Sequence, residues 1–576
     1  MFLFWDDFIF LGEAQENDLS RDYLTMGLFR HFSPVSRLVD LMVADSVADH
    51  PWVIPCVLFV LLAGVVASVV WLMVVLHGRT GYAFVGCVVV APSLTLLQLG
   101  NWWTAGVNIM PALIGCYLSF AAMVEVVRGR GSRFSILCWA GAALGVLDYE
   151  LPMLLIGYLG LWVLLFRDRV TAESLGVLAR RTWWTWAGLA TICLAAALNY
   201  RLNYYDPVPR PSVTDTAHAL VRSLVHTLVP TALGFHDPRS TGFSAFSLIV
   251  GCVTLSLAVL WLLVTREAAW KGLLFAAAGW LLPTLALVLN RVSIFGVHVV
   301  DNVIYFHLPT ALFAVGMLEA WRSPARLRGR RLRPPPVARR AMVASAIVVM
   351  LGGYAWSTGP TARYQLPEGA TPDYVEHARE SASVIGADGQ PFAVLGGDVP
   401  GFVVPGDFRP YNRVGRVLRL TVPDLHFDDP DRRLYRVDDS GNLVPAHIEW
   451  VRVAGPLELR LRNAPNRAIR SGNQLCFTST RDVSVIWALG EPVEGPGLVV
   501  RTTAEVSSPT GLRTVVRRTG ATTFDRANPD DHSLTPRRPG VLDNVQATSI
   551  ATLRVKGFDP GVDVCVKSVE VGRLVS

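Results

Sequence analysis

Long runs of apolar residues, many of them near the length needed to cross a bilayer, constrain this chain more than any other feature. Hydrophobic residues make up 52% of its 576 residues and charged residues only 17%, proportions typical of a protein that crosses a membrane several times. A span needs roughly 20 apolar residues, and hydropathy predicts about ten spans. They are 52–76, 82–97, 107–127, 134–147, 151–166, 183–198, 246–264, 272–289, 303–321 and 341–356. The sequence therefore predicts an α-helical polytopic membrane domain in the plasma membrane.

Basic residues between the spans predict which side of the membrane each loop faces. One arginine cluster precedes the fourth span and another follows the fifth. Both clusters can be cytoplasmic only if the chain crosses the membrane twice between them. These residues are Arg128, Arg130, Arg133, Arg167, Arg169, Arg180 and Arg181. Asp148 and Glu150 then lie at an extracytoplasmic turn between the two spans. By the same rule, residues 1–51 and everything after 356 are extracytoplasmic.

The composition changes from about residue 357, where the apolar runs end. A helical stretch at 371–386 is followed by segments that alternate apolar and polar residues between turns, such as "RVLRLTV", "VSVIWALG" and "VCVKSVEVG". This pattern predicts a β-sandwich or jelly roll. The expected domains are an extracytoplasmic loop with interfacial helices at 1–51, a transmembrane domain at 52–356 and an extracytoplasmic, mostly β-sandwich domain at 357–576.

Two of the eight cysteines lie in strand-like runs of the exported domain, whereas the other six lie in apolar spans. A cysteine in a span behaves as a small hydrophobic residue. Cys476 and Cys565 are a disulfide candidate because extracytoplasmic domains permit disulfides. Two reduced core cysteines are the alternative.

The chain starts "MFLFWDDFIFLGE", with Asp6 and Asp7 side by side in an apolar run. Up to about residue 42, apolar residues recur at helical spacing with charges between them, which predicts amphipathic helices along the membrane interface. The two carboxylates have two interpretations. They stabilise the positive N-terminus of a helix, or they form an extracytoplasmic catalytic pair.

This acidic pair, followed by interfacial helices, many short spans, large outer loops and an exported β-domain, resembles the GT-C class of membrane glycosyltransferases. The stretches "WDDFIFLGEA", "HFSPVSRL" and "GNWWTAG" also look like a group of large actinobacterial membrane proteins. The resemblance implies an inverting hexosyl- or pentosyltransferase that moves a sugar from a polyprenyl-phosphate donor to a cell-envelope glycan or lipid. The class has a span before the acidic loop, so we expect sequence upstream of Met1 that contains one.

The resemblance also implies roles for the residues in the outer loops. Asp6 or Asp7 would be the base that deprotonates the acceptor hydroxyl, and the pair could hold a divalent cation. Cations and hydrogen-bond donors would stabilise the departing phosphate. The outer-loop candidates for substrate binding are His31, Arg37, Asp148, Glu150, Arg222 and His226, with His236, Arg239, Arg291 and His298 as further members. For the histidines and arginines, a surface or snorkelling residue is the alternative. For Asp148 and Glu150, the alternative is a role in the hairpin turn.

Motifs of soluble enzymes are absent from the sequence, including a P-loop, a Cys-x-x-Cys pair and a nucleophile elbow. Their absence excludes an ATP-driven pump built on this chain alone. A secondary transporter or lipid-carrier flippase remains an alternative, because such proteins need a midplane site rather than a motif. A non-catalytic scaffold that anchors a glycan-binding sandwich is the third. The net charge of +6 lies largely in short loops and implies no nucleic-acid partner.

Overall fold

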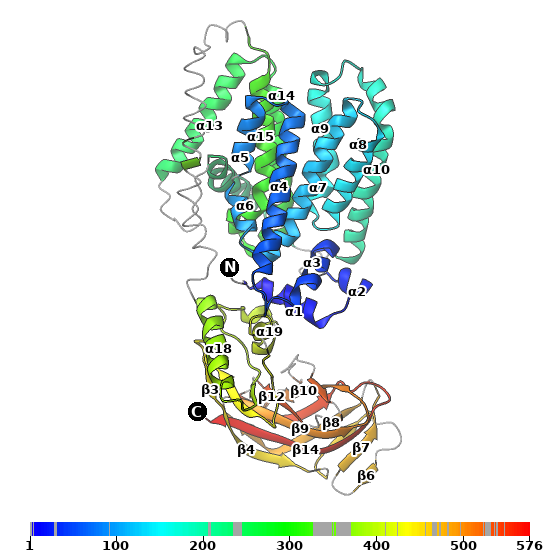
Figure 1. Ribbon diagram of the computed structural model, residues 1–576, viewed down its shortest axis with the longest axis vertical. Coiled ribbons are helices and arrows are strands. Elements are labelled where there is room, and N and C mark those ends of the chain that lie inside the picture. Colours follow the sequence, from blue (N-terminus) through cyan, green and yellow to red (C-terminus); the bar gives the residue numbers. More distant parts are fainter. Residues whose placement is uncertain are drawn as a thin grey trace. The chain divides into compact units, whose positions relative to one another are not determined.

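The computed structural model of this chain describes most of its residues and divides them into two compact units (Figure 1). The membrane unit comprises Ala14–Val43 and Trp52–Glu368, with Met1, and the C-terminal unit comprises Phe2–Glu13, Ala44–Pro51 and Gly369–Ser576. The residues outside the description are 1–2, 4, 28–30, 92, 205–208, 234–244, 327–347, 349–350, 353–369, 409–410, 423, 456, 464–468, 472–473, 481–482, 496, 522–523, 525–531, 535, 537–539, 546–547 and 576.

Within the described part of the membrane unit, four helical segments are long and apolar enough to cross a membrane. They are α4 (Val53–His77), α7 (Trp103–Val127), α14 (Ala269–Phe295) and Val303–Arg322, which contains α15 (His307–Arg322). Figure 1 shows further helices beside them. These are α5 (Gly81–Val90), α6 (Leu94–Leu99), α8 (Ser132–Val146), α9 (Leu155–Phe166), α10 (Leu175–Asn203), α11 (Val213–Arg222), α12 (Val229–Leu233) and α13 (Ala245–Thr265).

Three of the predicted spans or pairs of spans can be compared with the helix bounds as follows. The expected span at 82–97 is two helices, α5 and α6, and the sequence has a proline at position 92, which lacks the backbone N–H that a continuous helix needs. The fourth and fifth spans are separate helices, because α8 ends at Val146 and the next helical turn, η2 (Leu151–Leu154), follows Glu150. The span expected at 341–356 falls almost entirely outside the described residues.

Small residues let helices of the membrane unit approach closely. A Cβ atom on Gly272 of α14 would lie 2.3 Å from the backbone nitrogen of Ala320 and 2.4 Å from the carbonyl oxygen of Gly316, both in α15. Gly115 of α7 meets Gly141 of α8 in the same way, at 2.4 Å from its carbonyl oxygen. Glycines at such crossings are common in membrane helices, where packing rather than water exclusion holds helices together.

The described part of the first fifty residues contains three short helices. They are α1 (Asp6–Glu16), α2 (Arg21–Leu24) and α3 (Pro34–Ala44). Residues 2–13 belong to the C-terminal unit. There, the indole nitrogen of Trp5 donates to the carbonyl oxygen of Phe402 at 3.3 Å, and Glu13 pairs with Arg416 at 3.2 Å.

Two antiparallel sheets pack face to face in the C-terminal unit. One has the strand order β11-β10-β13-β8-β5, and the other has the order β12-β9-β14-β7-β6, with β4 paired to β14. Trp487 and Leu553 from the first sheet share a buried core with Val500 and Val569 from the second. The strands are β4 (His447–Ala454), β5 (Arg460–Arg462), β6 (Ile469–Ser471), β7 (Gln474–Thr478), β8 (Ser484–Glu494), β9 (Leu498–Val506), β10 (Thr510–Arg517), β11 (His532–Leu534), β12 (Gly540–Val545), β13 (Ser549–Lys556) and β14 (Asp563–Val575).

A smaller lobe precedes the sandwich and includes the predicted helix, α18 (Ala370–Gly386). Its sheet consists of β1 (Phe392–Val394), β2 (Arg433–Val437) and β3 (Leu443–Pro445). The segment "RVLRLTV" was expected to be a strand, and this prediction is wrong, because most of it lies in or directly after helix α19 (Val414–Arg419). The buried side chains of α19 are Val414, Val417 and Leu418, and this spacing is helical rather than alternating.

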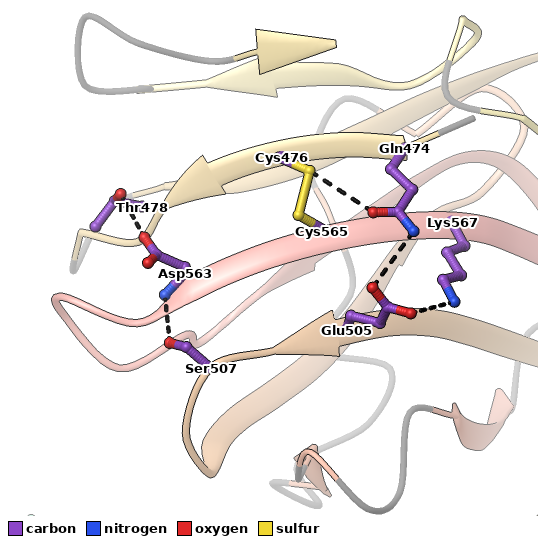
Figure 2. The surroundings of a disulfide bond; sticks show 8 residues. All are labelled: Gln474, Cys476, Thr478, Glu505, Ser507, Asp563, Cys565 and Lys567. Atoms are coloured by element: carbon purple, nitrogen blue, oxygen red, sulfur yellow. Dashed lines mark hydrogen bonds and ion pairs between the residues drawn. A yellow bond between two sulfur atoms is a disulfide. The ribbon is translucent and has the colours of Figure 1, made fainter. Parts of the chain in front are cut away.

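Cys476 and Cys565 face each other directly across the antiparallel strands β7 and β14 and form a disulfide (Figure 2). Their Cα atoms lie 4.0 Å apart, and the bridge joins positions separated by 89 residues. Figure 2 shows polar contacts next to it, including the hydrogen bond from Thr478 to Asp563 at 2.7 Å. Of the two alternatives for these cysteines, the structure has the bridged one.

Candidate functional site

A cavity of about 280 Å³ lies inside the membrane unit. Its walls come from α7, α14, the start of α15 and the turn between α8 and α9, and most of the lining side chains are apolar. The apolar ones include Ile109, Leu113, Met153, Leu154, Leu287, Ile304, Phe306 and Leu308. Charged or titratable side chains enter this lining at a few positions, chiefly His31, Glu150 and Arg291. The cavity is therefore apolar over most of its wall and charged at one place.

His31, Glu150 and Arg291 form a continuous chain of contacts in this wall. Nδ1 of His31 lies 3.0 Å from a carboxylate oxygen of Glu150, and a guanidinium nitrogen of Arg291 lies 2.6 Å from Nε2 of the same ring. Because arginine can only donate, Nε2 accepts and the ring proton sits on Nδ1, where it is donated to Glu150. The Tyr149 ring stacks on His31 with centroids 5.3 Å apart, which holds the imidazole in this orientation.

The residues around Glu150, which lies in the turn after α8, determine the charge of its carboxyl group. Burial would raise the pKa of this carboxyl, but the neighbouring His31 and Arg291 outweigh burial and lower the pKa below its usual value. Glu150 is therefore ionised near neutral pH. An ionised carboxylate orients the imidazole, and Arg291 contributes the positive charge that faces the cavity.

Asp148, two residues earlier, has a different environment from that of Glu150. One of its carboxylate oxygens accepts from the backbone N–H of Ser36 at 3.0 Å and also contacts the Ser36 hydroxyl. Burial raises the pKa of Asp148 well above its usual value. Asp148 thus anchors the first turn of α3 and is not among the residues that line the cavity.

Arg37 is also buried on α3 and is not part of the cavity lining. Its guanidinium lies over the ring of Tyr23 at 5.8 Å from the centroid. One turn further on, Asp40 accepts a hydrogen bond of 2.8 Å from the indole nitrogen of Trp103. These contacts fix α3 against its neighbours, which is a structural role.

Arg222 belongs to a second polar cluster. Its guanidinium donates to both carboxylate oxygens of Asp301, at 2.7 Å for the closest contact, and His298 lies 3.1 Å from the same carboxylate. His226 follows one turn later, in the short π-helix η4 (Ser223–Leu228). Neither Arg222 nor His226 lines the cavity. His236 and Arg239 lie outside the described residues.

The cavity lies at the opposite ends of its helices from the arginine clusters. Along α7, Ile109 and Leu113 are in the first half, whereas Arg128 follows the last residue. In α14 the order is reversed, with Lys271 near the start and Arg291 near the end. In α15, His307 begins the helix and Arg322 ends it. The charge-rich and cavity-bearing ends of the membrane unit are thus distinct.

Asp6 and Asp7 occupy the first turn of α1, in the part of that helix that belongs to the C-terminal unit. Asp7 is fully buried and Asp6 is partly exposed. Carboxylates in the first turn favourably meet the positive end of the helix dipole. Both interpretations of the pair are therefore compatible with its local structure, but Asp6 is the member that solvent can reach.

Among the residues that the structure describes, no three His, Cys, Asp or Glu side chains gather into a group that could hold a metal ion. The acidic pair itself, Asp6 and Asp7 in the first turn of α1, could contribute two carboxylate ligands.

Two residues near the cavity were not predicted. His307 lines the cavity and its Nδ1 lies 2.7 Å from the hydroxyl of Tyr117, which is buried in α7. Tyr149 lines it as well. A histidine at the start of an apolar span, in "YFHLP", is a signal that could have identified His307, because ionisable groups within membrane segments tend to be functional. Nothing in the local sequence distinguishes Tyr149 from an interfacial aromatic residue.

No protein-family model and no curated protein matches this chain. Among solved structures, the arabinofuranosyltransferase AftD from mycobacteria is similar at 11% identity with a TM-score of 0.33, over 99% of this chain and 59% of AftD. A mutant of AftD matches at 12% identity and a TM-score of 0.31, over 89% of this chain and 55% of that one. This chain thus spans little more than half the length of AftD.

A low-affinity xylan-binding module from Roseburia intestinalis is similar to a smaller part of the chain. The match has 16% identity and a TM-score of 0.18, over 22% of this chain and 95% of the module. Likenesses this distant assign neither a fold nor an activity.

Proposed function

We propose that this chain is a membrane glycosyltransferase that moves a sugar from a polyprenyl-phosphate donor to a glycan or lipid acceptor of the cell envelope. The observation that carries the proposal is the cavity of the membrane unit, whose mostly apolar wall presents Arg291 beside His31 and Glu150. A prenyl phosphate is complementary to this wall, because its chain is apolar and its head group is anionic. Its phosphate would replace His31 as the acceptor of hydrogen bonds from Arg291.

The reaction needs little more than charge stabilisation and a base. The acceptor oxygen forms a bond to the anomeric carbon of the sugar, and the bond between that carbon and the phosphate oxygen breaks. The products are a glycoside and a polyprenyl phosphate, and the proton of the acceptor hydroxyl passes to the base. Arg291 would stabilise the negative charge that develops on the departing phosphate.

We place this reaction on the extracytoplasmic face of the plasma membrane. Arginine-rich helix ends face the cytoplasm in most membrane proteins, and the cavity lies at the other ends of α7, α14 and α15. The same reasoning assigns the C-terminal unit to the outside. Its disulfide supports this assignment, because oxidising compartments are where structural disulfides persist.

Asp6 and Asp7 are not among the residues that line the cavity. We assign the base to one of them on the resemblance of the acidic pair to that of the GT-C class, with Asp6 favoured because it is partly exposed and Asp7 is buried. A lipid-carrier flippase could use the same cavity to hold a phosphate, but it would need no base. The acidic pair therefore distinguishes a transferase from a flippase or a scaffold.

The test measures transfer of labelled pentoses and hexoses from synthetic polyprenyl-phosphate donors by membranes that contain each variant. If Asp6 is the base, Asp6→Asn should lower transfer about 100-fold or more, because the amide keeps the shape but cannot accept the proton. Asp7→Asn and Asp7→Ala test the other member of the pair. Asp18→Asn is the matched control, since Asp18 is an exposed carboxylate just beyond α1.

A helix-stabilising role predicts the opposite contrast. Asn would then leave transfer unchanged, whereas Ala at Asp6 or Asp7 would lower helix stability by about 1 kcal/mol and reduce the amount of protein in the membrane. If all variants keep wild-type transfer per molecule, the acidic pair is not the catalytic site.

A further inference from the structure

The charges in the wall of the cavity balance one another. The carboxylate of Glu150 carries one negative charge, and the guanidinium of Arg291 carries one positive charge. His31 lies between them and is neutral, because its Nε2 accepts a hydrogen bond of 2.6 Å from Arg291. Among the described residues that line the cavity, Glu150 and Arg291 are the two with a full charge. The net charge of this part of the wall is therefore zero.

The other titratable side chains around His31 leave this balance unchanged. Tyr149 stacks on the ring, and burial raises the pKa of its hydroxyl well above the usual value. Asp148 is not part of the lining, and burial raises the pKa of its carboxyl, which favours the neutral form. The remaining titratable residues of the lining come from α10, the turn η6 (Val303–Phe306) and α15, and they are Tyr200, Tyr305 and His307. Tyrosines are neutral near pH 7, and the histidine is hydrogen-bonded at 2.7 Å to a buried tyrosine hydroxyl of α7.

A phosphodiester at Arg291 would disturb the balance. The sugar donor proposed above is a phosphodiester, which carries one negative charge, and its oxygen would replace Nε2 of His31 as the acceptor from the guanidinium. The wall and the ligand together would then hold two negative charges and one positive charge. A net charge in mostly apolar surroundings is costly unless a counter-charge compensates it.

Nε2 of His31 is in the right place to receive a compensating proton. Once Arg291 bonds to the phosphate, the lone pair of this nitrogen would face the same anion, whereas a protonated nitrogen would donate to it. The other ring nitrogen, Nδ1, lies 3.0 Å from a carboxylate oxygen of Glu150, so protonation at Nε2 keeps that contact and adds the attraction between a carboxylate and an imidazolium. The side chains of His31 and Glu150 are 20% and 22% exposed. Water can therefore deliver the proton.

We propose that the cavity takes up one proton when it binds a lipid phosphodiester, and that His31 receives this proton at Nε2. A bond forms between Nε2 and the proton, which leaves a buffer acid whose conjugate base stays in solution. The imidazolium then lies at the phosphate together with Arg291, so two cations stabilise the charge of the departing phosphate. This inference rests on the proposed function, because it needs a phosphate in the cavity, but it holds whichever residue is the base of the transfer reaction.

Glu150 is a less suitable acceptor for the proton. Its neighbours hold the pKa of this carboxyl below the usual value. A protonated Glu150 would also leave the lone pair of Nε2 facing the phosphate, so the repulsion at that atom would remain. The two acceptors predict different results for a variant without the imidazole, because only a proton on Glu150 would still be taken up there.

The test is calorimetric titration of the full-length protein in detergent with farnesyl methyl phosphate. This phosphodiester keeps one charge, whereas a phosphate monoester changes its own charge near pH 6. Titrations in HEPES and in Tris, which differ in heat of ionisation, give the number of protons taken up. Farnesol is the neutral ligand for comparison. The test variant is His31→Gln, and the matched control is His298→Gln, because His298 also lies beside a carboxylate, at 3.1 Å from Asp301, but outside the cavity lining.

We expect the wild-type protein at about pH 7.5 to take up about 0.5 to 1 proton with the phosphodiester, since a histidine in water is mostly neutral there. Farnesol should cause no uptake. Because the bound state holds the extra proton, affinity for the phosphodiester should fall by up to about tenfold for each pH unit above this. His31→Gln should abolish both the uptake and the pH dependence, whereas His298→Gln should keep them.

Two outcomes would overturn this inference and leave the proposed function intact. They are preferential binding of the phosphodiester with an uptake below about 0.2 proton, and an uptake that persists in His31→Gln. Equal affinities of the wild-type protein for the phosphodiester and farnesol would overturn the inference and the proposed function together. The comparison of buffers uses the unmodified protein, so it decides the matter even if the variant does not fold.

Discussion

Replacing Arg291 by Gln should abolish the preference of the cavity for a phosphate over a hydroxyl. The guanidinium is the positive charge in a mostly apolar cavity wall, and it contacts Nε2 of His31 at 2.6 Å. A hydrogen bond to a charged partner at a partly buried place contributes about 2 to 3 kcal/mol, which corresponds to a loss of about 30- to 150-fold in affinity for the phosphate. Arg291→Lys keeps the charge but not the planar fork, so its loss should be smaller, about fivefold.

Calorimetric titration of the purified protein with a short-chain prenyl phosphate and with the matching prenyl alcohol measures this preference as a ratio of two affinities. The ratio removes contributions of the apolar chain, which both ligands share. Arg210→Gln is the matched control, because Arg210 is an exposed arginine outside the cavity lining. A wild-type protein that binds phosphate and alcohol equally, or an Arg291→Gln variant with an unchanged ratio, would refute the assignment of the cavity to a lipid phosphate.

Three further predictions concern the scaffold. Replacing Cys476 and Cys565 by Ser should lower the free energy of unfolding of the C-terminal unit by up to about 4.6 kcal/mol, the entropy of closing a loop across 89 positions; denaturant unfolding measures it, and a loss below 1 kcal/mol would contradict it. Gly272→Leu should deplete folded protein, because a Cβ there meets backbone atoms of α15, whereas Gly157→Leu has open space and should not; the yield of monodisperse protein after detergent extraction compares them. A reporter fused after residue 356 should be active only outside the cytoplasm, and cytoplasmic activity would reverse the assigned orientation.

Much of the architecture follows from the sequence because it depends on periodicity. Apolar length predicted the four helical segments that are long enough to cross a membrane. Alternation predicted strands such as β8 and β14 to within a few residues. One strand prediction failed because the segment fits both a strand period and a helix period. "RVLRLTV" alternates on paper, yet Val414, Val417 and Leu418 are buried on one side of a helix. Contacts of residues 2–13, such as the hydrogen bond from Trp5 to Phe402, reach residues hundreds of positions away, and no local sequence pattern reports such pairing.

The sequence indicated candidate residues for the site, but it did not indicate which of them lie together. The positive-inside rule placed His31, Glu150 and Arg291 in outer loops together with several residues that the cavity does not use. Which of them meet depends on the packing of α7, α14 and α15, and that packing is set by side-chain shapes and by glycines such as Gly272. Composition treats Asp148 and Glu150 alike, whereas one anchors α3 and the other orients a histidine.

The placement of residues 2–13 in the C-terminal unit constrains the order in which this protein can mature. Phe8, Ile9 and Phe10 are buried in the finished structure, and the Trp5 hydrogen bond closes across 397 positions of sequence. The ribosome makes Trp5 long before it makes Phe402, so this hydrogen bond cannot form until residue 402 is synthesised. A product truncated after the spans would lack that partner, and its N-terminal segment could not complete its native contacts.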